Sequence, residues 1–152
     1  MRLGLLSFAI AAVLSGVPAA AAVPQKAVTA CMDTADAADK LPANCLGLIL
    51  ADCKKAPNAD ENACAAKELA FWSEQLGSVL KAATAAMSGY PELAKPQGDA
   101  QKAWLLFRDK ACAIADKVDP GTMPGGSAWC RAEVTAERVF MLRRISASLG
   151  EH

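Results

Sequence analysis

Three charged side chains in the last third of the chain could form a binding site or an ion-pair site. Arg108 and Asp109 lie beside apolar residues of one expected helix, and Arg138 lies beside apolar residues of another. One interpretation is a patch that binds a partner protein. The other is a partly buried network of salt bridges, with Glu61 or Glu68 as the counter-charge. We favour the network, because an arginine within an apolar stripe usually has an internal partner.

No set of residues indicates catalysis. The only histidine, His152, is the last residue, where little ordered structure is expected. Catalysis by Ser/His/Asp or Cys/His sets requires a positioned imidazole. The acidic residues fall on expected helix surfaces, and no two of them stand out as a general acid and base: Glu61, Glu68, Glu74, Asp109, Glu133 and Glu137. The sequence therefore predicts that the protein is not an enzyme.

The sequence does not indicate a metal or cofactor site. It has no Cys-x-x-Cys motif and no pair of histidines. Asp33, Asp36 and Asp39 recur at a spacing of three and could form a calcium-binding edge. A solvated helix face explains them better, because no glycine-bearing ligand loop follows. We therefore expect neither a metal nor a cofactor.

The helices that position these residues can be read from the apolar pattern. Around Arg108, apolar residues at spacings of three and four form one face of a helix: Trp104, Phe107, Ala111, Ile114 and Val118. Ser127 is a good cap for a following helix, which carries Cys130, Val134, Arg138, Leu142, Ile145 and Leu149. These two helices form a hairpin that a Cys112–Cys130 disulfide could close.

A longer helix is predicted over residues 61–87, with a buried stripe of Leu69, Trp72, Leu76, Val79, Leu80, Ala83 and Met87. Shorter helical segments are predicted over 31–39 and 45–55, and loops over 88–99 and 119–127. Strand patterns are absent. The predicted fold is all-α, a small disulfide-stapled helical bundle with three main helices and a short N-terminal helical segment. The residues expected to dominate its core are Trp72, Trp104, Phe107 and Phe140.

Residues 1–22 have the features of a signal peptide. Arg2 precedes an apolar run over residues 3–17, and the small residues before Val23 fit a cleavage site after Ala22. The run is too short for a transmembrane helix, so no stable membrane insertion is expected after cleavage. The mature domain is then residues 23–152, in the periplasm of a bacterium or secreted.

All six cysteines follow this leader: Cys31, Cys45, Cys53, Cys64, Cys112 and Cys130. An even number of cysteines in an exported chain indicates disulfides, and six cysteines allow 15 pairings. Residues 28–31 also resemble a lipobox, in which Cys31 would carry a lipid. Pro24 and Lys26 interrupt the apolar run that should lead into such a box, and lipidation would leave an odd number of thiols.

The charge of the chain is balanced. It has 16 basic and 16 acidic residues, and loss of Arg2 with the leader leaves 15 basic against 16 acidic, a net charge of −1. This balance argues against a nucleic-acid-binding protein, which needs a basic surface. It also predicts no strong electrostatic attraction to a cationic partner.

Several uncommon residues recur in the order of a known family. They are Gln101, Trp104, Phe107, Arg108, Asp109 and Cys112, followed by Gly125, Gly126, Ser127, Cys130, Thr135 and Arg138. Upstream, the first half of the same pattern is matched by Cys53, Glu61, Cys64 and Leu69. This pattern, over roughly residues 53–149, resembles the LprI-type lysozyme-inhibitor N-terminal domain family.

The resemblance implies a small, helical, secreted domain in which Cys53 pairs with Cys64 and Cys112 with Cys130. Cys31 is then left for Cys45. It also implies a non-catalytic binding protein whose partner is lysozyme or another cell-wall hydrolase. A rigid frame would present the loops 88–99 and 119–127 to that partner.

Three residues near those loops are candidate contacts with the partner: Tyr90, Glu92 and Trp129. Exposed rings on loops suit protein recognition, whereas rings folded back would cap the core, and the sequence leaves both readings of Tyr90 and Trp129 open. Glu92 or Asp99 could face the cationic surface of lysozyme. The alternative function is a structural or stress-related periplasmic module that binds another envelope protein.

Overall fold

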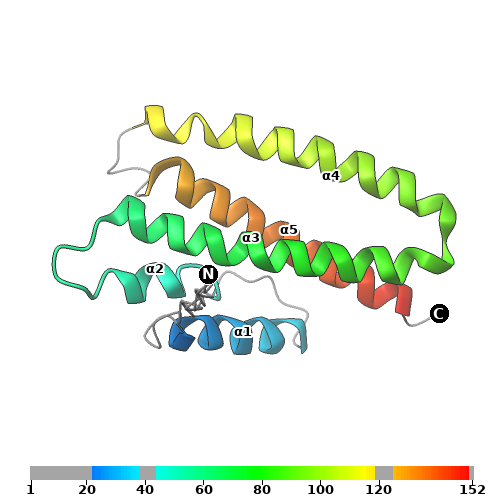
Figure 1. Ribbon diagram of the computed structural model, residues 1–152, viewed down its shortest axis with the longest axis horizontal. Helices are drawn as coiled ribbons and strands as arrows, with labels where there is room; N and C mark the ends of the chain where they lie inside the picture. Colours follow the sequence, from blue (N-terminus) through cyan, green and yellow to red (C-terminus); the bar gives the residue numbers. More distant parts are fainter. Residues whose placement is uncertain (1–21, 38–43, 119–124, 151–152) are drawn as a thin grey trace, which may run out of the picture.

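The computed structural model describes residues 22–37, 44–118 and 125–150. Two long helices, α3 (Glu61–Ala86) and α5 (Gly126–Gly150), pack along each other and form the centre of the molecule (Figure 1). The described residues contain helices and no strand, which confirms the predicted all-α fold.

The other helices lie on two sides of the α3–α5 pair. Helix α4 (Pro91–Cys112) runs along one side, while α1 (Ala22–Ala37) and the short α2 (Leu48–Cys53) lie on the opposite side (Figure 1). Two short 3-10 helices, η2 (Met87–Gly89) and η3 (Ala115–Lys117), follow α3 and α4. The bundle is therefore built around α3 and α5, with α4 as an outer helix.

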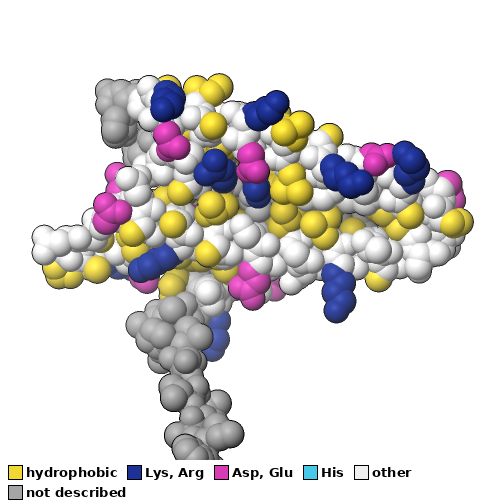
Figure 2. Space-filling view, turned by 45° about the horizontal axis from the view of Figure 1, so that its top comes forward, with side chains coloured by type: hydrophobic (Ala, Val, Ile, Leu, Met, Phe, Trp, Pro, Cys, Tyr) yellow, Lys and Arg dark blue, Asp and Glu magenta, His cyan; other side chains and the backbone are white. Residues whose placement is uncertain are grey.

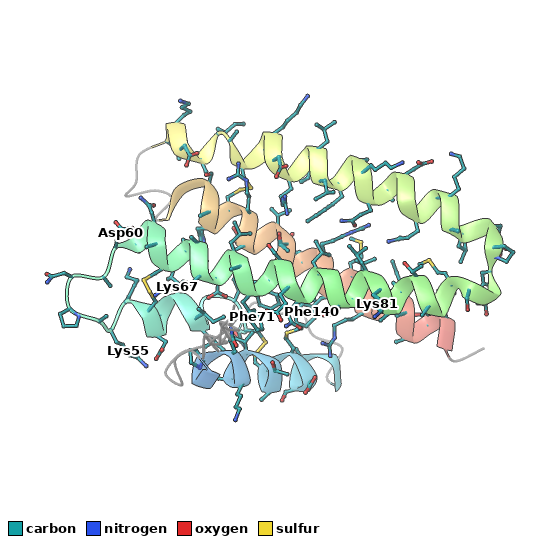
Figure 3. The ribbon with its side chains drawn as sticks, in the orientation of Figure 1. Lys55, Asp60, Lys67, Phe71, Lys81 and Phe140 are labelled. Atoms are coloured by element: carbon teal, nitrogen blue, oxygen red, sulfur yellow. A yellow bond between two sulfur atoms is a disulfide. The ribbon has the colours of Figure 1, made fainter. Side chains whose placement is uncertain are left out.

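Aromatic side chains fill the core between α3, α5 and α1. Trp72 is fully buried, the ring of Phe71 meets it edge-on at 5.3 Å between centroids, and the ring of Phe140 lies 6.2 Å away. Figure 3 shows Phe71 and Phe140 on the side of α3 that faces α1. The predicted core positions of Trp72 and Phe140 are confirmed. Apolar residues of the other helices complete the same cluster: Val28, Met32, Ile49, Leu76, Val79, Ala83, Met87, Ala132, Ala136, Val139 and Leu142.

Helix α3 matches its prediction closely. The carboxylate of Asp60 accepts a hydrogen bond of 2.7 Å from the backbone N–H of Ala63, so this residue caps the helix. Figure 3 shows Asp60 at the start of α3. Most of the predicted apolar stripe is buried, and only Leu69 and Leu80 remain partly exposed.

Helix α1 is longer than predicted. It begins at Ala22, well before the predicted start at residue 31, because Val28 and Met32 on one of its faces are buried in the core. Residues 1–21 of the predicted leader lie outside the described residues. No helix in the described parts of the chain is long and apolar enough to cross a bilayer.

Helix α4 begins earlier than the sequence predicted. Residues 91–99 were expected to lie in a loop, but they form the first turns of the helix, with Pro91 in its first turn and Pro96 inside it. Pro91 costs little there, because the first N–H groups of a helix have no intrahelical partner. Pro96 removes the hydrogen bond to the carbonyl of Glu92, but both residues are exposed, so water can bond that carbonyl. The predicted loop over residues 88–99 is therefore wrong.

The predicted apolar face of α4 is also not a core face. Phe107 is 60% exposed and Ile114 is 63% exposed, and Val118 is exposed as well. The reason is the position of Cys112, which is five residues after Phe107 and therefore about 140° around the helix from it. Because the disulfide turns the Cys112 side toward α5, the side that carries Phe107 is directed away from the core. Phe107 is thus not a core residue, and Trp104 is only partly buried.

Three disulfides join neighbouring cysteines in the sequence. Cys31 pairs with Cys45, Cys53 with Cys64, and Cys112 with Cys130, each with Cα atoms 5.5 Å apart. The second and third pairs are those that the family resemblance implies, and the first is the pair that it leaves. The first bond uses the sulfur atom of Cys31 that a lipid would occupy, so the structure gives no support to the lipobox.

Removal of the Cys112–Cys130 bond should destabilise the protein. The bond closes a loop of 18 residues between α4 and α5. In the chain-entropy model, a loop of this length stabilises the folded state by about 3 kcal/mol. We expect the double variant Cys112→Ala/Cys130→Ala to lose about that free energy of unfolding in urea titrations. A loss below about 1 kcal/mol would contradict the assignment of this bond as the link that holds α4.

The start of α5 is capped by an acidic residue of η3. The carboxylate of Asp116 accepts a hydrogen bond of 2.9 Å from the backbone N–H of Ser127, and this bond, with the Ser127 hydroxyl and the nearby charge of Arg131, lowers the pKa of Asp116 below its usual value. A negative charge at a helix N-terminus is also favourable for the helix dipole. Ser127 is therefore the capped residue at this end, and Asp116 supplies the cap.

The lowered pKa of Asp116 predicts how stability depends on pH. Because the folded pKa lies below the unfolded one, the ionised carboxylate stabilises the fold above about pH 4, and this contribution is lost as the pH falls through the folded pKa. The variant Asp116→Asn imitates the neutral acid. We expect its Tm to lie below that of the wild type at pH 6, and the difference to shrink as the pH is lowered toward 2. A constant difference across this range would contradict the prediction.

Candidate functional site

The family-pattern residues of the last two long helices meet along the seam between α4 and α5. Residues at spacings of three and four place Gln101, Trp104 and Arg108 on one face of α4, opposite Thr135 and Arg138 of α5. The Cys112–Cys130 disulfide fixes one end of the seam. The family-pattern residues of these helices therefore lie together in the structure. We call Gln101, Trp104, Arg108, Thr135 and Arg138 the α4–α5 seam.

The ring of Trp104 lies near two arginines. The guanidinium carbon of Arg108 lies 5.2 Å from the centroid of its ring, and that of Arg138 lies 5.9 Å from it. Both distances permit a cation–π attraction. The other parts of the Trp104 side chain pack against the core cluster. The ring thus links α4 to the core and holds two positive charges near each other.

Arg138 is buried without a carboxylate partner among the described residues. Its side chain donates from Nε to Oε1 of Gln101 at 3.3 Å and from Nη1 to the sulfur of Met141 at 3.2 Å, while Nη2 has no hydrogen-bond partner. The residue is 8% exposed, and burial lowers the pKa of its guanidinium. The hydroxyl of Thr135, one turn earlier, is buried and unpartnered too. This part of the seam has donors that could bind an acceptor group.

Arg108 has the partner that Arg138 lacks. Its Nε and Nη2 donate to Oδ1 of Asp109 at 3.0 and 2.8 Å, and Arg131 of α5 lies 3.7 Å from the same oxygen. The predicted salt-bridge network therefore exists for Arg108, although Asp109 is half exposed and the pairing contributes little to stability.

The predicted counter-charges were wrong. Glu61 pairs with Lys54 at the start of α3. Glu68 is completely buried on the other side of α3, where its carboxylate accepts three hydrogen bonds, from the backbone N–H groups of Gly47 and Leu50 and from the indole of Trp72, at 2.7–3.0 Å. Neither acid reaches Arg138, because α4 and its seam lie on the opposite side of the central pair.

The sequence did not predict that Glu68 connects α2 to α3. It caps the N-terminus of α2 from outside that helix and ties it to Trp72. The signal that could have shown it is its position, because Glu68 lies four residues before Trp72 on the buried stripe of α3. An acid in such a stripe needs internal donors.

The candidate contact residues do not come together. Trp129 lies in the first turns of α5, and its ring packs beside Gly47 at the start of α2, with a distance of 3.3 Å to a Cβ placed there. Its role is to cap the fold. Tyr90 precedes α4 at the opposite end of the molecule and is partly buried, while Glu92 is exposed in the first turn of that helix. Asp99 is paired with Lys95 at 2.6 Å.

An exposed apolar ridge runs along the outer side of α4 and continues past Cys112 into the turn that follows the helix. Leu106, Phe107 and Ile114 are 58%, 60% and 63% exposed, and Leu105 and Val118 flank them. Figure 2 shows hydrophobic side chains at the surface among lysines and arginines on the side of the molecule that carries α4. Adjacent large apolar residues left in water often mark a site of protein binding. We call Leu106, Phe107 and Ile114 the α4 ridge.

No metal site is formed by the described part of the chain, in which no group of three or more His, Cys, Asp or Glu residues could hold an ion. Of the three aspartates considered as a calcium edge, Asp33 pairs with Arg143 of α5 at 3.3 Å. Asp39 and His152 lie outside the described residues.

The comparisons with known proteins agree with this architecture. The model of the family described as "Lysozyme inhibitor LprI" matches residues 53–142, which is more than half of the chain and includes α3, α4 and most of α5. No curated protein and no solved structure matches the chain. The matched segment holds two of the three disulfides and the complete α4–α5 seam. The chain belongs to the LprI lysozyme-inhibitor family.

Proposed function

We propose that this chain is an exported, non-catalytic protein that binds and inhibits lysozyme or another cell-wall hydrolase through the α4 ridge. Family membership is the observation that carries the proposal. The three disulfides support export, because such bonds persist in oxidising compartments such as the periplasm. Cleavage of a leader after Ala22 belongs to the same proposal.

The α4 ridge has the properties of an anchor for a partner. Its side chains are large, apolar and already exposed, so binding removes them from water without unfolding any part of the protein. The helix beneath them is held by the Cys112–Cys130 bond at one end and by Trp104 in the middle. A surface held in this way loses little conformational entropy on binding.

Electrostatics should contribute less than apolar contact. Exposed Lys102, Lys110 and Lys117 border the ridge, and Asp109 and Asp116 only partly balance them. Lysozyme has a cationic surface, so this border gives it no attraction. We therefore expect inhibition to change little with salt concentration, unlike that of an inhibitor that is steered by charge.

Inhibition can be tested with the chain purified from the periplasm after export. We expect it to slow the lysis of bacterial cell walls by lysozyme in a turbidity assay. The double variant Phe107→Gln/Ile114→Gln should weaken inhibition at least roughly tenfold, ~1.4 kcal/mol in binding free energy, because it removes the two most exposed apolar side chains. Its Tm should stay close to that of the wild type, since neither side chain is buried, glutamine is a good helix former at position 107, and Ile114 lies in the turn after α4.

The matched control is Ile145→Gln, which removes an exposed apolar residue of α5 that is outside the ridge. It should inhibit as the wild type does. Absence of inhibition by the wild type at micromolar excess would remove lysozyme as the target. Equal inhibition by the wild type and the ridge variant would remove the ridge as the contact surface.

A second candidate is a periplasmic module that binds another envelope protein. The basic border of the ridge favours a target less cationic than lysozyme. Pull-down from a periplasmic extract with the wild type and the ridge variant distinguishes the two. A partner captured by the wild type alone, with no effect on lysozyme, would favour this candidate.

A further inference from the structure

We infer that a cavity between the end of α3 and the first half of α4 binds an amphiphile that has an apolar chain and a carboxylate head. The cavity has a volume of about 510 Å³. This volume is within the range of pockets that hold small organic ligands. The site is separate from the α4 ridge and goes beyond the proposed function.

The body of the cavity is apolar. Its walls include Leu80 and Met87 from α3 and η2, and Pro91 and Ala94 from the first turns of α4. The hydroxyl of Thr84, which also lines it, donates to the carbonyl of Leu80 and so has no need of a ligand. Such a lining suits an alkyl chain, whose burial is favourable in proportion to the apolar area removed from water.

The polar side of the cavity offers a donor that has no acceptor. Gln97 and Gln101 lie one helical turn apart on α4, and both line the cavity. The side-chain Nε2 of Gln97 is buried and has no hydrogen-bond partner. Arg138 does not line the cavity, but it is hydrogen-bonded to Gln101, which does, and its Nη2 is also unpartnered. Buried donors normally have acceptors, so a ligand with acceptor oxygens would complete this side of the cavity.

The charge near the cavity favours a negatively charged head. Arg138 donates a hydrogen bond of 3.3 Å to Gln101 and has no carboxylate partner in the described parts of the chain. Of the acids on α4, Asp99 pairs with Lys95 and Asp109 with Arg108, while Glu92 is exposed in the first turn, at the other end of the cavity from Gln101. A carboxylate supplies acceptor oxygens for Gln97 and a counter-charge for Arg138, which is hydrogen-bonded to Gln101. A neutral head would supply only the acceptors.

Calorimetric titration with dodecanoate, and with dodecanol as the uncharged probe, tests the site. We expect dodecanoate to bind the wild-type chain with one-to-one stoichiometry and roughly tenfold more tightly than dodecanol. Arg138→Met, which keeps an apolar side chain of similar length, should remove this preference and leave dodecanol binding unchanged. Gln97→Leu should weaken dodecanoate at least roughly tenfold.

Two further variants serve as controls, one that should block the cavity and one that should have no effect. Ala94→Trp places a large ring at an exposed rim position and should abolish binding of both probes. Arg144→Met removes an exposed charge from the same helix as Arg138 and should change nothing. Failure of dodecanoate to bind the wild type would overturn the proposal, as would equal binding of dodecanoate by the wild type, Arg138→Met and Ala94→Trp. Lysozyme inhibition is measured separately, so the proposed function can fail without affecting this result.

Discussion

Glu68→Ala should lower the free energy of unfolding by about 4 kcal/mol. The carboxylate of Glu68 accepts hydrogen bonds from Gly47 N–H at 3.0 Å, Leu50 N–H at 2.9 Å and the Trp72 indole at 2.7 Å. Alanine leaves all three donors without an acceptor in a site that has no exposure, and each unsatisfied donor costs about 1–3 kcal/mol. The loss should also free the start of α2 and expose Trp72.

Urea titration followed by tryptophan fluorescence measures this effect. Glu68→Gln should lose less, because its single amide oxygen can still accept from one or two of the donors. Glu74→Ala is the matched control, since Glu74 lies on the same helix and is exposed, and it should change stability by less than about 0.5 kcal/mol. A loss below about 1 kcal/mol for Glu68→Ala would show that α2 does not depend on this carboxylate.

Gly125→Ala should lower the free energy of unfolding by about 3–4 kcal/mol. Gly125 has a φ of 79°, a conformation that costs a residue with a side chain about 1–2 kcal/mol. A Cβ at this position would lie 2.8 Å from the Cβ of Ala65 on α3 and 3.0 Å from that of Trp129. Overpacking of this kind typically costs a further 1–3 kcal/mol. The start of α5 would have to move away from α3.

Gly77→Ala is the matched control for Gly125→Ala. Gly77 lies inside α3, and an added Cβ there would meet no atom within 4 Å. Alanine should therefore stabilise the protein by about 1 kcal/mol through its helix propensity. Opposite signs for the two glycine variants in thermal melting would support the close approach of α5 to α3. A stable Gly125→Ala variant would contradict it.

The sequence predicted the helices and the disulfide pairs well, because both depend on information that is local or carried by the family pattern. The apolar stripe of α3 is set by residues within a few turns of one another. The large errors in helix position were the starts of α1 and α4, and at α4 Pro96 and Gly98 indicated a loop. Propensity is a weak predictor at an exposed helix start, where water can satisfy the carbonyl that proline leaves free.

The candidate site could be predicted only in part. Spacings of three and four placed Gln101, Trp104 and Arg108 on one face of a helix, and the structure brings this face against Arg138. The sequence did not predict the ion partners of Arg108 and Arg138. Glu61 and Glu68 were the expected counter-charges, but in the structure both lie away from the seam. The partner of a charge depends on how whole helices are arranged.

The sequence by itself determined that this protein is a helical domain with six cysteines, balanced charge and an LprI pattern. Only the tertiary structure decided which apolar face is buried. Periodicity predicted Trp104 and Phe107 on one face of a helix, but it does not show what covers that face. The disulfide to Cys130 turns α4 so that Phe107 faces water, and Glu68 binds α2 across 21 residues of sequence. Both outcomes depend on contacts between distant segments, which a local pattern does not encode.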